Sequence, residues 1–262
     1  MIVRWLTNQR LPHTMSRIKA FFIHLGISSL VYLILLYLIV FIWYPQPFFA
    51  ADGGWQGIRL VTGIDMVLGP VLTLIVFKTG KPGLKFDLAL IGIFQTLALS
   101  WGVWTVYDQR TALVVFANDA YHTLNSEQVA GVGKPATKII EHADTRPPYA
   151  YVKLPADKSE LKKLVRSLFS GKPLFLRGEL YVPLTADLKL TMIAKSLTIP
   201  ALLNKSAQNQ KLLDDFLQQR QQKVDAYAFL PLHCRYSDLV VVLDRKNGEI
   251  VGSLNIDTAW LR

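Results

Sequence analysis

Hydrophobic residues are concentrated in the first 107 positions of the chain, in three runs at about 20–43, 58–77 and 88–106. Each run is close to the roughly 20 apolar residues that a transmembrane helix needs. The remaining residues, 108–262, alternate short apolar runs with polar turns, a pattern typical of one soluble domain with its own core. The pattern therefore predicts a short tail (1–19), a three-helix membrane domain (20–107) and a soluble domain (108–262).

The positions of the charges predict how the spans are oriented. The tail carries four basic residues and no acid, and the turn from Lys78 to Lys85 holds three lysines, whereas Asp52 is the only charge in the loop 45–57. Because lysine and arginine favour the cytoplasmic side, we expect the tail and the lysine turn inside and residues 108–262 outside. The lysine turn is also suited to binding anionic lipid. The first run is longer than the apolar core of a signal peptide, which favours an uncleaved anchor.

Asp65 places a carboxylate inside the second run, in the stretch Gly63-Ile-Asp-Met-Val-Leu-Gly-Pro70. An ionised aspartate deep in the hydrocarbon costs about 3 kcal/mol, so this side chain needs a partner. Counting 1.5 Å per residue puts Asp65 about 10 Å below the outer interface, and Ser100 of the third run reaches a similar depth. Gln95 and Thr96 lie deeper on that run. We therefore expect a polar seam formed by these four residues, with a kink at Gly69–Pro70.

Three interpretations of Asp65 are open: a neutral carboxyl that hydrogen-bonds a neighbouring helix, a docking point for the transmembrane helix of another protein, and a proton or ion relay. His24 and the small residues after it either have a function or let another helix approach closely. The candidate helix-docking residues are Asp65, Gly69, Pro70, Gln95, Thr96 and Ser100.

The soluble domain is predicted to be α+β with an antiparallel sheet. An N-cap at Asp157 with Glu160 begins a helix whose apolar stripe runs from Leu161 to Phe169 and ends at Gly171. A second helix is predicted at 201–224, with Leu213, Phe216 and Leu217 facing inward, and a loose polar tract at 125–148. Strands are predicted at 112–116, 149–154, 174–176, 180–182, 188–193, 237–243 and 249–256, the last two forming a hairpin at Asn247-Gly248.

The composition argues against several classes of protein. The formal charge of +10 divides equally before and after residue 108 and forms no basic stripe, so we expect no nucleic-acid partner. One cysteine, Cys234, excludes an internal disulfide framework. His122, His142 and His233 lack the spacing of a metal site, and neither a phosphate-binding loop nor a nucleophile elbow is present. We therefore expect no catalytic, cofactor-binding or metal-binding residues.

Several motifs together resemble the TfpX/TfpZ family of type IV pilin accessory proteins. They are the stretch from Met15 through Phe21-Phe-Ile-His24 to Ser28, the Gly63–Pro70 stretch, Asp87-Leu-Ala-Leu-Ile with Gln95 and Tyr107-Asp-Gln-Arg110, and Phe229-Leu-Pro-Leu continuing through Leu243–Val251 to Asp257. The chain departs from the family pattern where Thr111 and Thr258 stand in place of proline. The resembling sequence opens at Met15, and we expect residues 2–14 to be dispensable.

The resemblance implies a non-enzymatic protein of the bacterial inner membrane with a periplasmic domain. It also implies a chaperone-like role in pilin stability, pilus assembly or pilus extension and retraction. This role would be exerted through contact with type IV pilin or the pilus assembly machinery, and we expect it to need no cofactor. The alternative is a membrane-bound transferase that modifies pilin. Such an enzyme needs acids or donor-binding groups at the membrane face, where the sequence offers only Asp52, Asp108 and Arg110.

Overall fold

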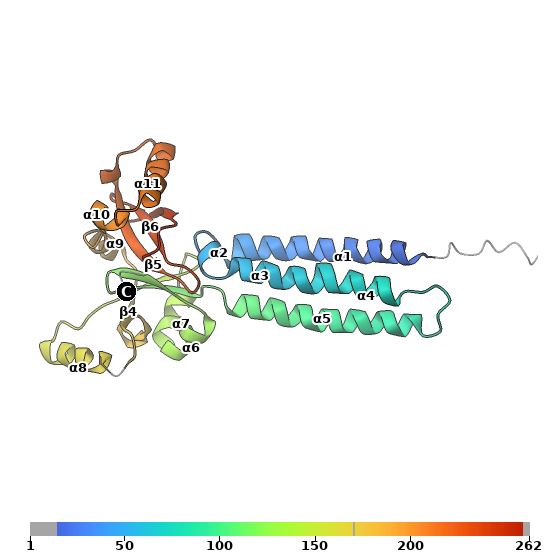
Figure 1. Ribbon diagram of the computed structural model, residues 1–262. Coiled ribbons are helices and arrows are strands. Elements are labelled where there is room, and N and C mark those ends of the chain that lie inside the picture. Colours follow the sequence, from blue (N-terminus) through green and yellow to red (C-terminus); the bar gives the residue numbers. More distant parts are fainter. Residues whose placement is uncertain (1–14, 170, 259–262) are drawn as a thin grey trace, which may run out of the picture. The chain divides into compact units, whose positions relative to one another are not determined.

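The computed structural model describes residues 15–169 and 171–258. Within them, three helical stretches are long and apolar enough to cross a membrane: Arg17–Trp43, Gly54–Val76 and Leu84–Asp108 (Figure 1). A domain of helices and one sheet follows, so the predicted order of three spans and an α+β domain is confirmed. The chain divides into two compact units, which we call the helical unit (Met1–Ile39 and Gln56–Thr105) and the sheet unit (Val40–Trp55 and Val106–Arg262).

The spans are built from helical segments of two kinds. The first consists of α1 (Arg17–Tyr37) and η1 (Leu38–Trp43), the second of α3 (Gly54–Val61), η2 (Thr62–Leu68) and α4 (Gly69–Val76), and the third of α5 (Leu84–Asp108). Both η1 and η2 are π-helical. Short π-helical stretches inside α-helices often occur at functional sites. Here η2 contains Asp65, and Pro70, which has no backbone N–H to donate, follows it.

The sheet has seven strands in the order β4-β3-β1-β2-β5-β6-β7. The strands are β1 (Leu113–Ala117), β2 (Ala120–Leu124), β3 (Tyr149–Val152), β4 (Tyr181–Pro183), β5 (Tyr227–His233), β6 (Leu239–Asp244) and β7 (Ile250–Leu254). The pairs β1–β3 and β2–β5 are parallel and the other four are antiparallel. The sheet is therefore mixed, and the prediction of an antiparallel sheet was wrong.

One of the two parallel pairs, β2–β5, was missed because β5 was not recognised as a strand. It contains Pro231, and a proline inside an apolar run normally argues against a central strand. In the structure, β5 pairs with β2 only through Leu232 and His233, so the parallel ladder begins after the proline. The return of the chain from α11 to the middle of the sheet makes this pair parallel.

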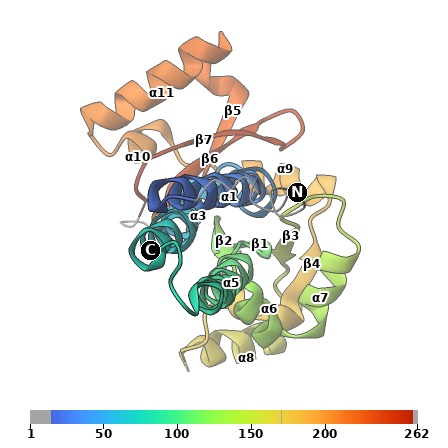
Figure 2. The ribbon, with the colours of Figure 1, turned by 90° about the vertical axis from the view of Figure 1, so that its right-hand side faces the viewer.

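Both faces of the sheet are buried. Along β1, Val114 and Phe116 enter one core cluster, while Leu113 and Val115 enter another. The first cluster also includes side chains of β5 and β6. The opposite face is divided between a cluster under β1 and β3 and a third cluster under β5 to β7. Figure 2 shows α10 and α11 beside β5 and β7 at one end of the sheet, and α7 beside β4 at the other.

The helices of the sheet unit differ from the prediction in several places. The predicted loose tract contains α6 (Ser126–Val132), which begins with a capping box at Asn125 and Gln128, and α7 (Lys134–Glu141). The predicted helix 201–224 is divided into α10 (Ile199–Leu203) and α11 (Ala207–Arg220), because Asn204 and Lys205 have positive φ angles. Its inward residues Leu213, Phe216 and Leu217 do join the third core cluster.

Two predicted strands are helical. The run 188–193 lies in α9 (Ala186–Ile193), and 174–176 forms the 3₁₀ turn η3 (Leu174–Leu176). Short apolar runs do not distinguish a strand from a buried helical segment, which explains both errors. The other short 3₁₀ turns are η4 (Gly178–Leu180) and η5 (Val224–Ala226).

The capped helix was predicted correctly as α8 (Lys158–Leu168), with Asp157 accepting from the backbone N–H groups of Ser159 and Glu160. Its predicted apolar stripe is not buried as a whole. Leu164 and Leu168 pack against a core cluster, but Phe169 is 89% exposed.

The loop between the first two spans is an integral part of the sheet unit. It contains the short helix α2 (Phe48–Ala51), and both Phe48 and Ala51 belong to the core cluster that includes Leu232 and Leu239. The carbonyl of Ala51 accepts hydrogen bonds from the backbone N–H groups of Tyr236 and Ser237 at 3.0 and 3.3 Å. These contacts fix the position of Asp52, the next residue.

Candidate helix-docking site

Asp65 is at the centre of a polar cluster that joins all three spans. Its side chain is 4% exposed. Gln95 Nε2 of α5 donates to Asp65 Oδ1 at 2.5 Å, and Ser28 Oγ of α1 donates to the same oxygen at 3.3 Å. Gln95 therefore contacts Asp65 from the third span. Ser100, the partner chosen by depth, does not, and that choice was wrong, because Ser100 lies about 140° around α5 from Gln95.

His24 and Thr73 extend the cluster from Gln95. His24 Nε2 lies 3.0 Å from Gln95 Oε1, and His24 Nδ1 lies 2.6 Å from Thr73 Oγ1. An amide oxygen only accepts, so Nε2 carries the proton of this pair, and in a neutral imidazole Nδ1 then accepts from the Thr73 hydroxyl. The result is one continuous chain of hydrogen bonds from Thr73 to Ser28.

The amide of Gln95 stands between the two titratable groups of this chain. It bonds His24 through its oxygen and Asp65 through its nitrogen. Because an amide does not readily take up and release protons, this geometry favours holding the helices together over conducting protons. The cluster still leaves Asp65 Oδ2 buried with no hydrogen-bond partner among the described residues. An unsatisfied buried acceptor costs about 1–3 kcal/mol.

Gly69 makes room for Gln95. A Cβ atom built on Gly69 would lie 2.2 Å from Gln95 Oε1, well inside van der Waals contact. Gly69 and Pro70 are both buried at the start of α4. The missing side chain of Gly69 thus lets the second span approach the Gln95 side chain of the third at the level of the polar cluster.

Thr96 and Ser100 lie outside the cluster. Thr96 Oγ1 donates to the Gly92 carbonyl of its own helix at 2.8 Å, and both side chains are on the exposed surface of α5. The six candidate residues therefore form two groups, an inner one with Asp65, Gly69, Pro70 and Gln95, and an outer one with Thr96 and Ser100.

Sequence reasoning singled out His24 and the small residues after it but did not connect His24, Ser28 or Thr73 with Asp65, because it compared depths only. Each residue of an α-helix turns about 100°, so residues four apart share a face. His24 and Ser28 have this spacing, as do Asp65, Gly69 and Thr73. Helical phase was the signal that would have identified them.

Asp52 is the second buried carboxylate of the chain and lies in the sheet unit, 3% exposed. Thr123 Oγ1 and the backbone N–H of Arg235 donate to Oδ1 at 3.1 and 3.0 Å, and Thr111 Oγ1 donates to Oδ2. Burial raises the pKa of Asp52 above its usual value, although these hydrogen bonds act in the opposite direction. The carboxylate is fully used in holding the loop to the sheet.

The other groups considered for catalysis also have structural contacts. The Arg110 guanidinium lies 3.6 Å from the centre of the Tyr107 ring and donates to the Tyr107 carbonyl. His142 Nδ1 lies 2.8 Å from the Lys138 carbonyl oxygen, and Cys234 is buried in the core. Across the described residues, no three His, Cys, Asp or Glu side chains gather in a way that would hold a metal ion.

Two cavities lie in the sheet unit, with volumes of about 890 and 690 Å³. The larger is lined by aromatic residues that include Tyr121 and Tyr149, and burial, followed by the charge of Glu249, raises the pKa of Tyr149 to about 12. The smaller contains His122, which stacks on Phe175 at 4.3 Å, and His233.

Comparison with known proteins identifies relatives over most of the chain. Residues 12–53 match the family described as "Fimbrial assembly protein FimB". The chain is 30% identical over 244 residues to "Fimbrial assembly protein, serogroup E1" of Dichelobacter nodosus, which covers 90% of this chain and 93% of the relative. It is 29% identical over the same length to the serogroup I protein of that organism. No solved structure matches. The chain therefore belongs to the fimbrial assembly protein family.

Proposed function

We propose that this protein is a non-enzymatic accessory factor for type IV pilin in the bacterial inner membrane, of the TfpX/TfpZ kind. It supports pilin stability, pilus assembly or pilus extension and retraction through contact with pilin or the assembly machinery. Membership of the fimbrial assembly protein family supports an assembly role, and three membrane-length helices are compatible with it. In this proposal residues 1–19 are cytoplasmic and 108–262 are periplasmic, and an alkaline-phosphatase fusion at the C-terminus should be active.

The observation that supports this mechanism is that the six candidate residues form an inner, buried group and an outer, exposed group. Asp65 and Gln95 are bonded within the helical unit, so they hold the three spans together and are not free to dock another helix. Thr96 and Ser100 face outward on α5, the least buried of the three spans. Small and hydroxyl-bearing residues let helices approach closely inside a membrane. We therefore assign the docking of a partner helix to the Thr96–Ser100 face.

The second candidate function, a pilin-modifying transferase, has less support. Asp52 and Arg110, two of the charged groups predicted at the membrane face, have structural partners. Docking at α5 also fits a partner anchored in the membrane by one apolar helix, as a pilin awaiting assembly is.

The test is co-purification of full-length pilin with the Thr96→Leu/Ser100→Leu variant in mild detergent. We expect the yield of pilin to fall several-fold, because two leucine side chains would hold a partner helix away. Ala98→Leu is the matched control, since Ala98 is an exposed small residue on another face of α5. Equal pilin yields from wild type and the double variant, with normal protein levels, would reject the docking face.

A further inference from the structure

The helix α8 presents an uncovered apolar row. Leu161, Val165 and Phe169 are spaced by four residues, so they form a line along the helix. Val165 is 47% and Phe169 is 89% exposed, and Leu161 is half-buried. The neighbouring line, Leu164 and Leu168, packs against the core cluster under β1 and β3. The helix thus needs only part of its apolar surface for the fold.

A basic row runs beside the apolar one. Lys158, Lys162 and Arg166 have the same four-residue spacing, and all three are exposed. None of them forms an ion pair with another residue that the structure describes. Between residues 157 and 172 the sequence holds five basic and two acidic residues. This surface combines a positive field with apolar side chains, and it would complement an acidic and apolar surface.

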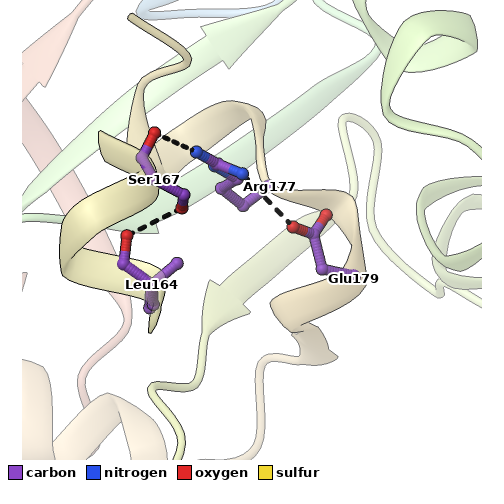
Figure 3. Close-up of polar contacts among 4 residues, drawn as sticks. All are labelled: Leu164, Ser167, Arg177 and Glu179. Carbon is purple, nitrogen blue, oxygen red and sulfur yellow. Dashed lines mark hydrogen bonds and ion pairs between the residues drawn. The ribbon is translucent and has the colours of Figure 1, made fainter. Parts of the chain in front are cut away.

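Hydrogen bonds fix the orientation of both rows. Asp157 caps the N-terminus of α8. At the other end, Arg177 donates to the Ser167 carbonyl at 2.8 Å, and Ser167 Oγ donates to the Leu164 carbonyl at 2.7 Å (Figure 3). A guanidinium at the C-terminal turn also interacts favourably with the helix dipole. The apolar row is therefore exposed on an anchored helix.

We propose that the α8 face, formed by Leu161, Val165, Phe169, Lys158, Lys162 and Arg166, is a docking surface for a protein whose own surface carries acidic side chains beside an apolar strip. We identify this partner as the soluble head of the pilin, an identification that rests on the proposed function. A protein is favoured over a lipid surface because, within the sheet unit, α8 lies at the end away from α2 (Figure 1). The helix α2 lies in the loop that connects the first two spans, within a few residues of each along the chain.

The experiment measures binding of the soluble pilin head to the full-length protein in nanodiscs of neutral lipid. We expect Lys162→Glu/Arg166→Glu and Val165→Ser/Phe169→Ser each to weaken binding about fivefold or more, because paired charges and buried apolar anchors dominate such interfaces. Binding by wild type should weaken as salt rises from about 0.1 to 0.5 M, since the charges become screened.

The matched controls are Lys211→Glu/Lys223→Glu, which reverses two exposed lysines elsewhere, and Leu190→Ser, which replaces an exposed leucine of α9. Both should bind the head like wild type. Thermal stability of every variant is recorded, and it should not change because the replaced side chains are exposed.

Several results would overturn the inference. The pilin head could bind wild type and the α8 variants equally, or not bind wild type at all while full-length pilin still co-purifies, and in both cases the proposed function would stand without the α8 surface. The α8 face could instead bind vesicles containing phosphatidylglycerol, or mediate self-association that the variants abolish. Absence of full-length pilin from the wild-type eluate would reject the proposed function itself.

Discussion

Two aspartates with nearly equal exposure, 3% for Asp52 and 4% for Asp65, are held by different kinds of partner. Asp52, in the sheet unit, accepts from two hydroxyls and a backbone N–H and uses both oxygens. Asp65, in the helical unit, accepts from side chains of two other spans through Oδ1 only. The sheet unit fixes a loop by satisfying one carboxylate completely, whereas the helical unit connects three helices and tolerates one unpaired oxygen.

The largest effect is expected from Asp52→Ala. This change leaves the Thr111 and Thr123 hydroxyls and the Arg235 N–H without their acceptor. Each unsatisfied buried donor costs about 1–3 kcal/mol, so the sheet unit should lose roughly 3 kcal/mol or more. The measurement is thermal unfolding of the purified protein followed by near-ultraviolet circular dichroism. A loss below about 1 kcal/mol would mean that water replaces the carboxylate.

A smaller effect is expected in the helical unit from Gly69→Ala. The added methyl group would displace the Gln95 side chain, and overpacking of this kind costs about 1–3 kcal/mol. Gly63→Ala is the control on the same span, because a Cβ atom at Gly63 would have no other atom within 4 Å and alanine is the better helix former. Unfolding in sodium dodecyl sulfate should separate the two variants, and equal stability would contradict the close approach of Gln95.

A change at Asp65 is expected to cost less than either. Asp65→Leu removes the acceptor for Ser28 and Gln95 and should weaken the bundle by about 1 kcal/mol, the usual size of an interhelical hydrogen bond. Asp65→Asn keeps an acceptor and should be tolerated. The ratio of surface to total pilin, with variant abundance measured in parallel, checks both. Loss of pili in the Asn variant at normal abundance would instead indicate a role for the charge or the proton.

The smallest expected effect is on the pH dependence of stability. It distinguishes the titratable carboxyl of Asp52 from the neutral amide of Asp52→Asn. Because the folded state raises the pKa of Asp52, the native protein binds more protons than the unfolded chain above about pH 4. The contribution of Asp52 to stability is therefore greatest at low pH and declines as pH rises through the folded pKa. The hydrogen bonds to Asp52 lower its pKa and so offset part of the increase that burial causes. The melting temperature of wild type relative to that of Asp52→Asn should fall as pH rises, and a constant difference would contradict the shift.

The spans were predictable because their signal is composition, which does not depend on tertiary contacts. The sheet was only partly predictable. The strand β6 is a continuous apolar run and was recognised, since a strand buried on both faces has this pattern. The strand β5 was hidden by Pro231, and α9 was mistaken for a strand because eight residues are too few to define a period.

The candidate site was predictable in depth but not in direction. Gln95 was predicted to lie deeper than Asp65 but in the same polar seam, and the two are bonded. Ser100 follows Gln95 by five residues, about 140° around the helix, so the two could not face one partner. Which residues of the first span join the polar cluster depends on which face of α1 is turned toward the other two spans. This orientation is set by the packing of all three helices. In the sequence of the first span, this orientation was indicated only by the four-residue spacing of His24 and Ser28, which places both on one face.

The loop that carries Asp52 also sets an order of events during synthesis. Its partner Arg235 is 183 residues further along the chain, so Phe48 and Ala51 cannot enter their core until almost the whole protein has left the ribosome. Until then Phe48 and Phe49 of the loop between the first two spans remain uncovered by the sheet. A chain interrupted before β5 would keep them so, and a fragment beginning at residue 108 would lack them altogether. The sheet unit is therefore complete only when the loop 45–57 and the strands β5 and β6 are present together.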